Sequence, residues 1–175
     1  MSCKLESIVV LMILLILTGC NNFSNQEIID LRGKKIARIP KSVFENPEIK
    51  RELYIGIDEF TVYPPMSIVP MGEIQLSTVN EKLSELIFLE RLSITSTQIE
   101  KLPDSMSNLK KLKYLNLSFN DKLKLENEIG KIALLKSLDT LVLYGVELDL
   151  DLRSRLRLEI SGIQIIDEIS LTRTL

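Results

Sequence analysis

The feature that most constrains this chain is a set of apolar residues that recur at a nearly constant spacing. The clearest unit, residues 89–103, reads LERLSITSTQIEKLP. The same L-x-x-L-x-L arrangement begins again at Leu112 and once more at Leu138. Alternate residues of a short strand point to opposite faces, so the apolar positions share one face. One unit cannot bury that face alone, so the spacing predicts units that stack around a common core.

The pattern extends toward both ends of the chain. Residues 29–40 and 53–64 align with residues 92–103 without a gap, and each segment ends in proline. Residues 158–165 fit the same pattern as a final strand. Five or six copies in one register predict a repeat that covers residues 26–166.

The register is poor between residues 65 and 88, and two interpretations stay open there. The segment is either a degenerate repeat with a strand at 74–79 or a helical or irregular insertion. Thr78 begins a T-x-x-E capping box, which predicts a helix from this point to about Phe88.

These units resemble leucine-rich repeats of the roughly 23-residue class, whose pattern is L-x-x-L-x-L-x-x-N/T-x-L. The resemblance implies an α/β solenoid of about five to seven repeats over residues 26–175. Such a solenoid has a concave sheet of short parallel strands and a convex side of helices and turns. In that class the N/T side chain bonds backbone groups in the turn. Because only three of the six side chains here suit that role, we expect an incomplete ladder along Lys34, Asp58, Thr97, Asn120, Val146 and Ile163.

Residues 1–25 have the features of an export signal followed by a tether. An unbroken apolar run from Ile8 to Leu17 is about half the length that a membrane-spanning helix needs. The following Leu17-Thr18-Gly19-Cys20 resembles the lipobox of bacterial lipoproteins. The resemblance implies a signal peptide over 1–19, lipidation of Cys20 with acyl chains such as palmitate, and a lipidated tether over 20–25. It also implies a membrane-anchored protein of the bacterial cell envelope, in the outer membrane if the source has two membranes. Two alternatives to a cleaved and lipidated signal peptide stay open: a buried apolar helix with an incidental cysteine, and an uncleaved anchor.

Composition argues against several classes of function. The chain has no histidine, which removes catalysis by Ser-His-Asp or Cys-His groups and metal binding through imidazole. Its net charge of −2 argues against a nucleic-acid partner, which would require a basic face. We therefore expect a chain that is not an enzyme and that uses no cofactor and no metal. We also expect it to be a monomer. The acidic residues Glu147, Asp149 and Asp151 alternate with leucine, which is typical of a solvated surface.

A run of lysines gives the chain one local basic edge. It comprises Lys110, Lys111 and Lys113, with Lys122 and Lys124 nearby. A solvated surface is the favoured interpretation, and contact with an anionic phospholipid or a glycan is the alternative.

Outward-facing strand positions provide a candidate binding surface. Tyrosine and arginine are enriched in protein-binding hot spots, and three of the four tyrosines occupy such positions. We therefore expect a concave face that binds a protein ligand of unknown identity through Tyr54, Arg91, Tyr114, Asn116 and Tyr144. A simpler alternative is that tyrosine favours half-exposed strands. The alternative function is an envelope-assembly scaffold that docks a larger complex by its convex or end surfaces.

Overall fold

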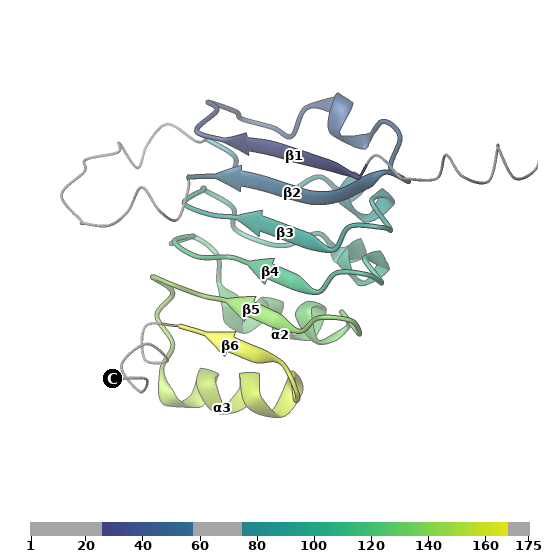
Figure 1. Cartoon of the computed structure of the whole chain (residues 1–175). Helices are drawn as coiled ribbons and strands as arrows, with labels where there is room; N and C mark the ends of the chain where they lie inside the picture. Colours follow the sequence, from purple (N-terminus) through teal and green to yellow (C-terminus); the bar gives the residue numbers. More distant parts are fainter. Residues whose placement is uncertain (1–25, 58–74, 168–175) are drawn as a thin grey trace, which may run out of the picture.

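The chain forms one parallel sheet with helical segments on one of its faces. The computed structural model describes residues 26–57 and 75–167. The sheet has six strands in the order β1-β2-β3-β4-β5-β6, and every neighbouring pair is parallel (Figure 1). The strands are β1 (Glu27–Arg32), β2 (Lys50–Gly56), β3 (Arg91–Ile94), β4 (Tyr114–Asn116), β5 (Thr140–Val142) and β6 (Gln164–Ile166). The expected α/β class with a parallel sheet is confirmed.

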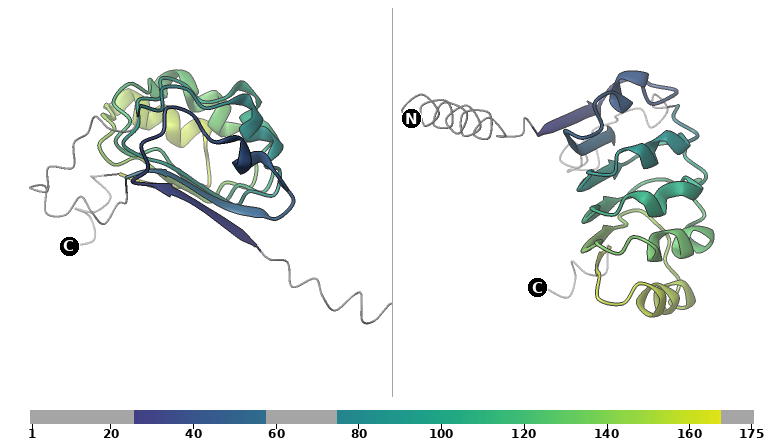
Figure 2. Two further views of the ribbon diagram at one scale, coloured as in Figure 1. Left: turned by 90° about the horizontal axis from the view of Figure 1, so that it is seen from above. Right: turned by 90° about the vertical axis from the view of Figure 1, so that its right-hand side faces the viewer.

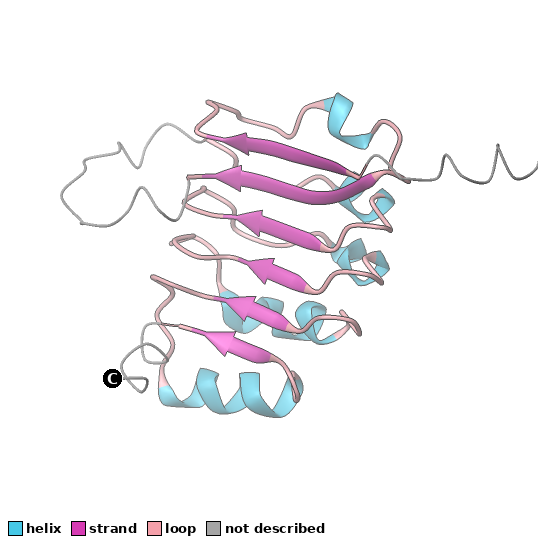
Figure 3. Ribbon diagram, in the orientation of Figure 1, coloured by secondary structure: helices cyan, strands magenta, loops and turns pink. Residues whose placement is uncertain are grey.

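The segments between the strands carry short helices. They are the 3-10 helices η1 (Lys41–Phe44), η3 (Glu81–Glu85) and η4 (Asp104–Asn108), and the α-helices α2 (Leu125–Ala133) and α3 (Leu150–Glu159). Figures 2 and 3 show these helices on the same side of the sheet, which leaves the opposite face uncovered by any helix among the described residues. We call that opposite face of the sheet the open face. It corresponds to the face expected to be concave.

Successive strands are separated by similar lengths of chain, with one exception. One row of register partners runs across the sheet through Ile28, Glu52, Arg91, Tyr114, Thr140 and Gln164. The step from Glu52 to Arg91 is clearly the longest in this row, yet β2 and β3 still pair directly. No strand of the described residues therefore lies between β2 and β3 in the sheet.

The leucine spacing works as the sequence predicts. The inward pairs Leu53 and Ile55, Leu92 and Ile94, Leu115 and Leu117, and Leu141 and Leu143 are all fully buried. Burying one such side chain stabilises the fold by roughly 1.5–3 kcal/mol. Because the pairs come from four neighbouring strands, they form one continuous core rather than separate clusters.

The strand expected at residues 74–79 is not present where the structure describes them. Residues 75–80 form no strand, although Leu76 and Val79 are buried. Helices η3 and η4 begin one repeat apart, so Leu76 and Val79 occupy the positions that Ile99 and Leu102 hold in the next repeat. This segment is therefore the return half of the repeat that β2 begins.

The helix expected from Thr78 is also shifted and shortened. Helix η3 ends at Glu85, and its N-cap is Asn80, whose side chain accepts a hydrogen bond from the Lys82 N–H. The Glu81 carboxylate does not close a capping box, because it binds the following repeat instead.

The prediction of a final strand over residues 158–165 is wrong. Residues 150–159 form helix α3, and the last strand is β6. The Asp149 carboxylate caps α3 by accepting a hydrogen bond from the Leu152 N–H. Leu158, expected to point into the core, is 80% exposed.

Asn120 satisfies the buried turn between two repeats. Its Oδ1 accepts hydrogen bonds from the Thr97 N–H at 3.0 Å and the Thr97 hydroxyl at 2.7 Å. Its Nδ2 donates to the carbonyls of Ile94 and Leu117, both at 2.8 Å. The expectation that the N/T side chain bonds backbone groups is confirmed for Asn120, whereas the Thr97 hydroxyl bonds the Asn120 side chain. Asp58, another such position, lies outside the described residues, as do residues 1–25 with the lipobox and Cys20.

Candidate functional site

The register of the sheet gathers most of the candidate residues on the open face. Glu52, Arg91 and Tyr114 are direct partners in one row across β2, β3 and β4. Tyr54 lies two positions further along β2, in a neighbouring outward row. The tyrosine and arginine positions predicted from the spacing are therefore neighbours in space.

Two arginine–tyrosine contacts organise this part of the face. The Arg91 guanidinium carbon lies 4.1 Å from the centre of the Tyr114 ring, and that of Arg32 lies 4.7 Å from the centre of the Tyr54 ring. The Tyr54 hydroxyl donates a hydrogen bond to Glu52 Oε2. Rings held in this way are already oriented, so less conformational freedom is lost when a partner binds.

Charges on the open face are paired at its β1 end. The Arg32 guanidinium donates to both oxygens of Asp30, at 2.9 and 2.6 Å. This bond holds the pKa of the Asp30 carboxyl at about 2, below its usual value of 3.8. Burial raises the pKa of the Tyr54 hydroxyl, and the bond to Glu52 adds to the rise. Arg91 lowers the pKa of Tyr54 but does not outweigh these effects.

Together these contacts define a group of residues that we call the open-face cluster: Asp30, Arg32, Glu52, Tyr54, Arg91 and Tyr114. Its two acids and two arginines balance, so the cluster carries no net charge. The sequence identified Tyr54, Arg91 and Tyr114 as candidates but missed the roles of Arg32 and Glu52. Part of their signal was available, since Glu52 is the outward position before Tyr54 on β2, and Arg32 is the outward position after Asp30, the register partner of Tyr54.

Asn116 lies in an outward row of the open face but is not exposed. Its exposed fraction is 0%, and Ser118, two positions later, is equally buried. The Asn116 Oδ1 accepts hydrogen bonds from the Ser118 N–H at 3.0 Å and the Ser118 hydroxyl at 2.6 Å. The expected exposure of Asn116 is therefore wrong, because its side chain shapes the turn after β4.

Tyr144 lies in a turn rather than on a strand. Strand β5 ends at Val142, and the Tyr144 N–H donates to the Ser118 hydroxyl at 3.0 Å. Its carbonyl accepts from the Phe119 N–H at 2.8 Å. This turn follows the end of β5 and is bonded to the turn that follows β4. Tyr144 therefore lies apart from the row that holds Arg91 and Tyr114.

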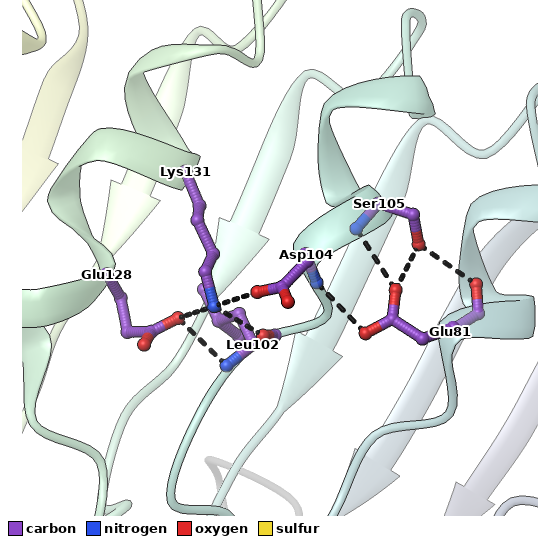
Figure 4. A network of polar contacts seen from close by, with 6 residues as sticks. All are labelled: Glu81, Leu102, Asp104, Ser105, Glu128 and Lys131. Carbon is purple, nitrogen blue, oxygen red and sulfur yellow. Dashed lines mark hydrogen bonds and ion pairs between the residues drawn. The ribbon is translucent and has the colours of Figure 1, made fainter.

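The helical side carries a second polar cluster, which spans three repeats (Figure 4). Glu81 Oε1 and Oε2 accept from the backbone N–H groups of Asp104 and Ser105, each at 3.0 Å. The Lys131 ammonium lies 2.8 Å from Asp104 and 3.1 Å from Glu128. Burial lowers the pKa of Lys131, but its bonds to the two carboxylates outweigh this and raise the pKa overall.

Every member of this second cluster contributes to packing between repeats. The buried Glu128 carboxylate accepts from the Leu102 N–H at 2.9 Å, and Lys131 donates to the Leu102 carbonyl at 2.8 Å. The Ser105 contacts lower the pKa of Glu81, so its carboxylate stays ionised while it caps η4. These bonds hold adjacent turns together, so the cluster is structural.

Comparison with known proteins finds similarity to plant proteins. Two probable disease resistance proteins of Arabidopsis thaliana are 35% identical over 91 residues and 32% identical over 100 residues. The disease resistance protein RFL1 of the same plant is 34% identical over 98 residues. These matches cover 51%, 57% and 55% of this chain and 10%, 12% and 11% of the relatives. The chain thus spans about a tenth of the length of these relatives. No protein-family model matches the chain.

These relatives overturn the bacterial interpretation of residues 1–25. The lipobox resemblance rests on the short motif Leu17-Thr18-Gly19-Cys20, and chance matches to so short a motif are common, whereas the plant similarity extends over 91 residues or more. The identification as a bacterial lipoprotein and the assignment to a bacterial envelope are therefore wrong, and the envelope-scaffold alternative falls with them. Within 26–57 and 75–167, no helix has the length and apolarity to cross a bilayer.

Proposed function

We propose that this chain is a leucine-rich-repeat solenoid that binds a protein partner through its open face. The observation that carries the proposal is the alignment of Arg91 and Tyr114 in one row, with the guanidinium 4.1 Å from the ring centre. Tyrosine and arginine supply large contact areas with polar ends, and they dominate protein-binding hot spots. Similar spacing of all strands except β2 and β3 supports the solenoid.

The chemistry of the open-face cluster favours a protein over a nucleic acid. Asp30 and Glu52 balance Arg32 and Arg91, whereas binding to phosphates needs an excess of positive charge. In this proposal the chain binds its partner as a monomer and catalyses no reaction. Because the relatives match over about a tenth of their length, none of their activity is carried over to this chain.

Site-specific photo-crosslinking tests the proposal. A benzoylphenylalanine at Thr140, next to Tyr114 on β5, is expected to crosslink to one discrete protein in extracts of the source organism. The same group at Asn127, exposed on α2, is the matched control and should not. The double substitution Arg91→Ala and Tyr114→Ala should remove the Thr140 product. Equal products from both positions, or no effect of the double substitution, would contradict binding at the open face.

A further inference from the structure

A second surface lies at the edge of the sheet where the strands begin. Two of the chain's exposed large apolar side chains occur there, Ile87 at 48% and Leu134 at 49% exposed. Lysines follow in the intervening repeat at 110 and 111. We define the strand-start patch as Arg51, Ile87, Phe88, Lys110, Lys111 and Leu134.

The repeat geometry brings these residues onto neighbouring turns. The Ile87 N–H donates to the Glu85 carbonyl at 2.9 Å, and the Lys110 N–H donates to the Asn108 carbonyl at 2.8 Å. Ile87 and Lys110 therefore hold equivalent positions in successive repeats. The turn before β5 is bonded to the turn that holds Lys110, because the Ser137 hydroxyl donates a hydrogen bond to the Lys110 carbonyl at 2.7 Å. Leu134 precedes Ser137 on that turn, so Ile87, Lys110 and Leu134 come from three successive turns.

Two cations of the patch lie close to the Phe88 ring. The Arg51 guanidinium carbon is 5.2 Å from the ring centre, and the Lys111 ammonium is 4.4 Å from it. Arg51 also donates to the Glu48 and Lys50 carbonyls, which are neutral acceptors. An aromatic ring held by two cations gives the patch a fixed apolar surface with positive charge beside it.

Positive charge exceeds negative charge around this edge. Glu90 is paired with Lys113 at 2.9 Å, and Lys113, Arg51 and Lys111 all help to lower the pKa of that carboxyl. The negative charge of Asp139 helps to raise the pKa of Lys113. The neighbouring turns also carry Lys110, Lys136, Glu48 and Glu85, so five cations and four acids lie around this edge. The local excess is one positive charge, in a chain whose net charge is −2.

We propose that the strand-start patch docks an acidic protein segment that also carries an apolar side chain. Carboxylates of that segment pair with Lys110 and Lys111, and its apolar side chain packs on Ile87, Phe88 and Leu134. Electrostatic complementarity of this kind sets both the orientation and the rate of association. The site is separate from the open-face cluster and does not depend on the function proposed for it.

A peptide selection on the full chain tests this proposal. A phage-displayed library of random dodecapeptides is panned on the immobilised protein, and enriched peptides are synthesised for fluorescence anisotropy. We expect peptides rich in Asp and Glu with at least one Leu, Ile or Phe. The variant Lys110→Glu with Lys111→Glu should weaken their binding at least tenfold, and Ile87→Ser should weaken it severalfold. Circular dichroism establishes that each variant is folded.

Two matched controls separate this site from others. The pair Lys122→Glu and Lys124→Glu makes the same charge change beside a different hollow of about 580 Å³ and should leave the affinity within twofold. Arg91→Ala on the open face should do the same, so loss through Arg91 alone would support the open face and overturn this proposal. Enrichment of neutral or basic peptides, or equal loss in the lysine control, would also overturn it. Sedimentation with phosphatidylserine vesicles in place of any acidic-peptide binding would overturn it in favour of a lipid surface.

Discussion

The middle of the sheet and its C-terminal end are built from the same repeat but are held together differently. In the middle, Leu115 and Leu117 are fully buried between neighbouring repeats, and Asn120 bonds backbone groups on both sides of the turn. At the end, Ile165 is only partly buried in β6, and Asp167 forms an ion pair with Arg153 of α3. The difference shows that a repeat draws much of its stability from having a neighbour on each side.

The largest expected effect comes from a close approach between β2 and β3. Gly56 has a φ of +114°, and an added Cβ would lie 1.8 Å from the Thr95 carbonyl oxygen. We expect Gly56→Ala to reduce the free energy of unfolding by about 3–6 kcal/mol, through backbone strain and overpacking together. Gly33→Ala is the control, because that glycine has a φ of +69° but open space around it. Its cost should be about 1 kcal/mol in urea denaturation, and equal costs would show that contact between the repeats is not the cause.

Truncating an inward leucine should distinguish the two regions directly. Leu115→Ala removes a fully buried side chain between two repeats and should cost about 2–5 kcal/mol. Ile165→Ala at the partly buried end strand should cost about half as much, because solvent already reaches that position. Urea unfolding of both variants measures the comparison. If the two losses are the same, the end repeat is as well supported as the middle.

Removal of the Asn120 amide should have a smaller but clear effect. Asn120→Ala leaves the Thr97 N–H and the carbonyls of Ile94 and Leu117 without their partner, at a cost of about 1–3 kcal/mol. Val146, the corresponding residue of the next repeat, contributes apolar contact alone, and Val146→Ala should cost about 1 kcal/mol. Thermal unfolding compares the stability losses of the two variants. A greater loss for Val146→Ala would contradict the view that the Asn120 hydrogen bonds stabilise the turn.

The smallest effect is expected at the β1 edge, where Asp30 titrates. Its pKa is about 2, below the usual value of 3.8 expected for the unfolded chain, so the ionised form is stabilised in the folded chain. That contribution is fully present above about pH 4 and is lost as the pH falls toward about 2. Because Asp30 is exposed, solvent screening limits it to a few tenths of a kcal/mol. An NMR titration of the Asp30 carboxyl measures the pKa, and Arg32→Gln should return it toward its usual value.

Leucine spacing predicted the sheet because both leucines of a Leu-x-Leu pair lie on one face of a strand and stack on the same pair of the neighbouring repeat. Residues 158–160 misled the same reasoning, since Leu158 and Ile160 are spaced like a Leu-x-Leu pair of a strand. The helix forms because Asp149 caps it and because Leu156 and Ile160, one helical turn apart, can be buried on one face. Spacing alone does not reveal which of two periodicities a segment will use.

The sequence could predict only those parts of the candidate site that follow from the pairing of strand residues in register. Arg91 and Tyr114 are one repeat apart, and so had to lie side by side. The burial of Asn116 could not be read in the same way, because it depends on hydrogen bonds to Ser118 after the strand has ended. Outward positions of the repeat can hold either a side chain that bonds within a turn, such as Asn116, or an accessible one, such as Tyr114, and the spacing does not distinguish the two.

The direct pairing of β2 with β3 across the longest connection in the sheet has an evolutionary consequence. The side chains that these strands bury fix their alignment, and each doubling of the connecting length adds only about 0.6 kcal/mol of closure entropy, so extra chain costs the fold little. Insertions or deletions in this connection that spare its packed return half at 75–86 leave the pairing of β2 with β3 in place. New sequence, and with it new specificity, can thus be acquired at this one junction while the remainder of the protein is inherited intact.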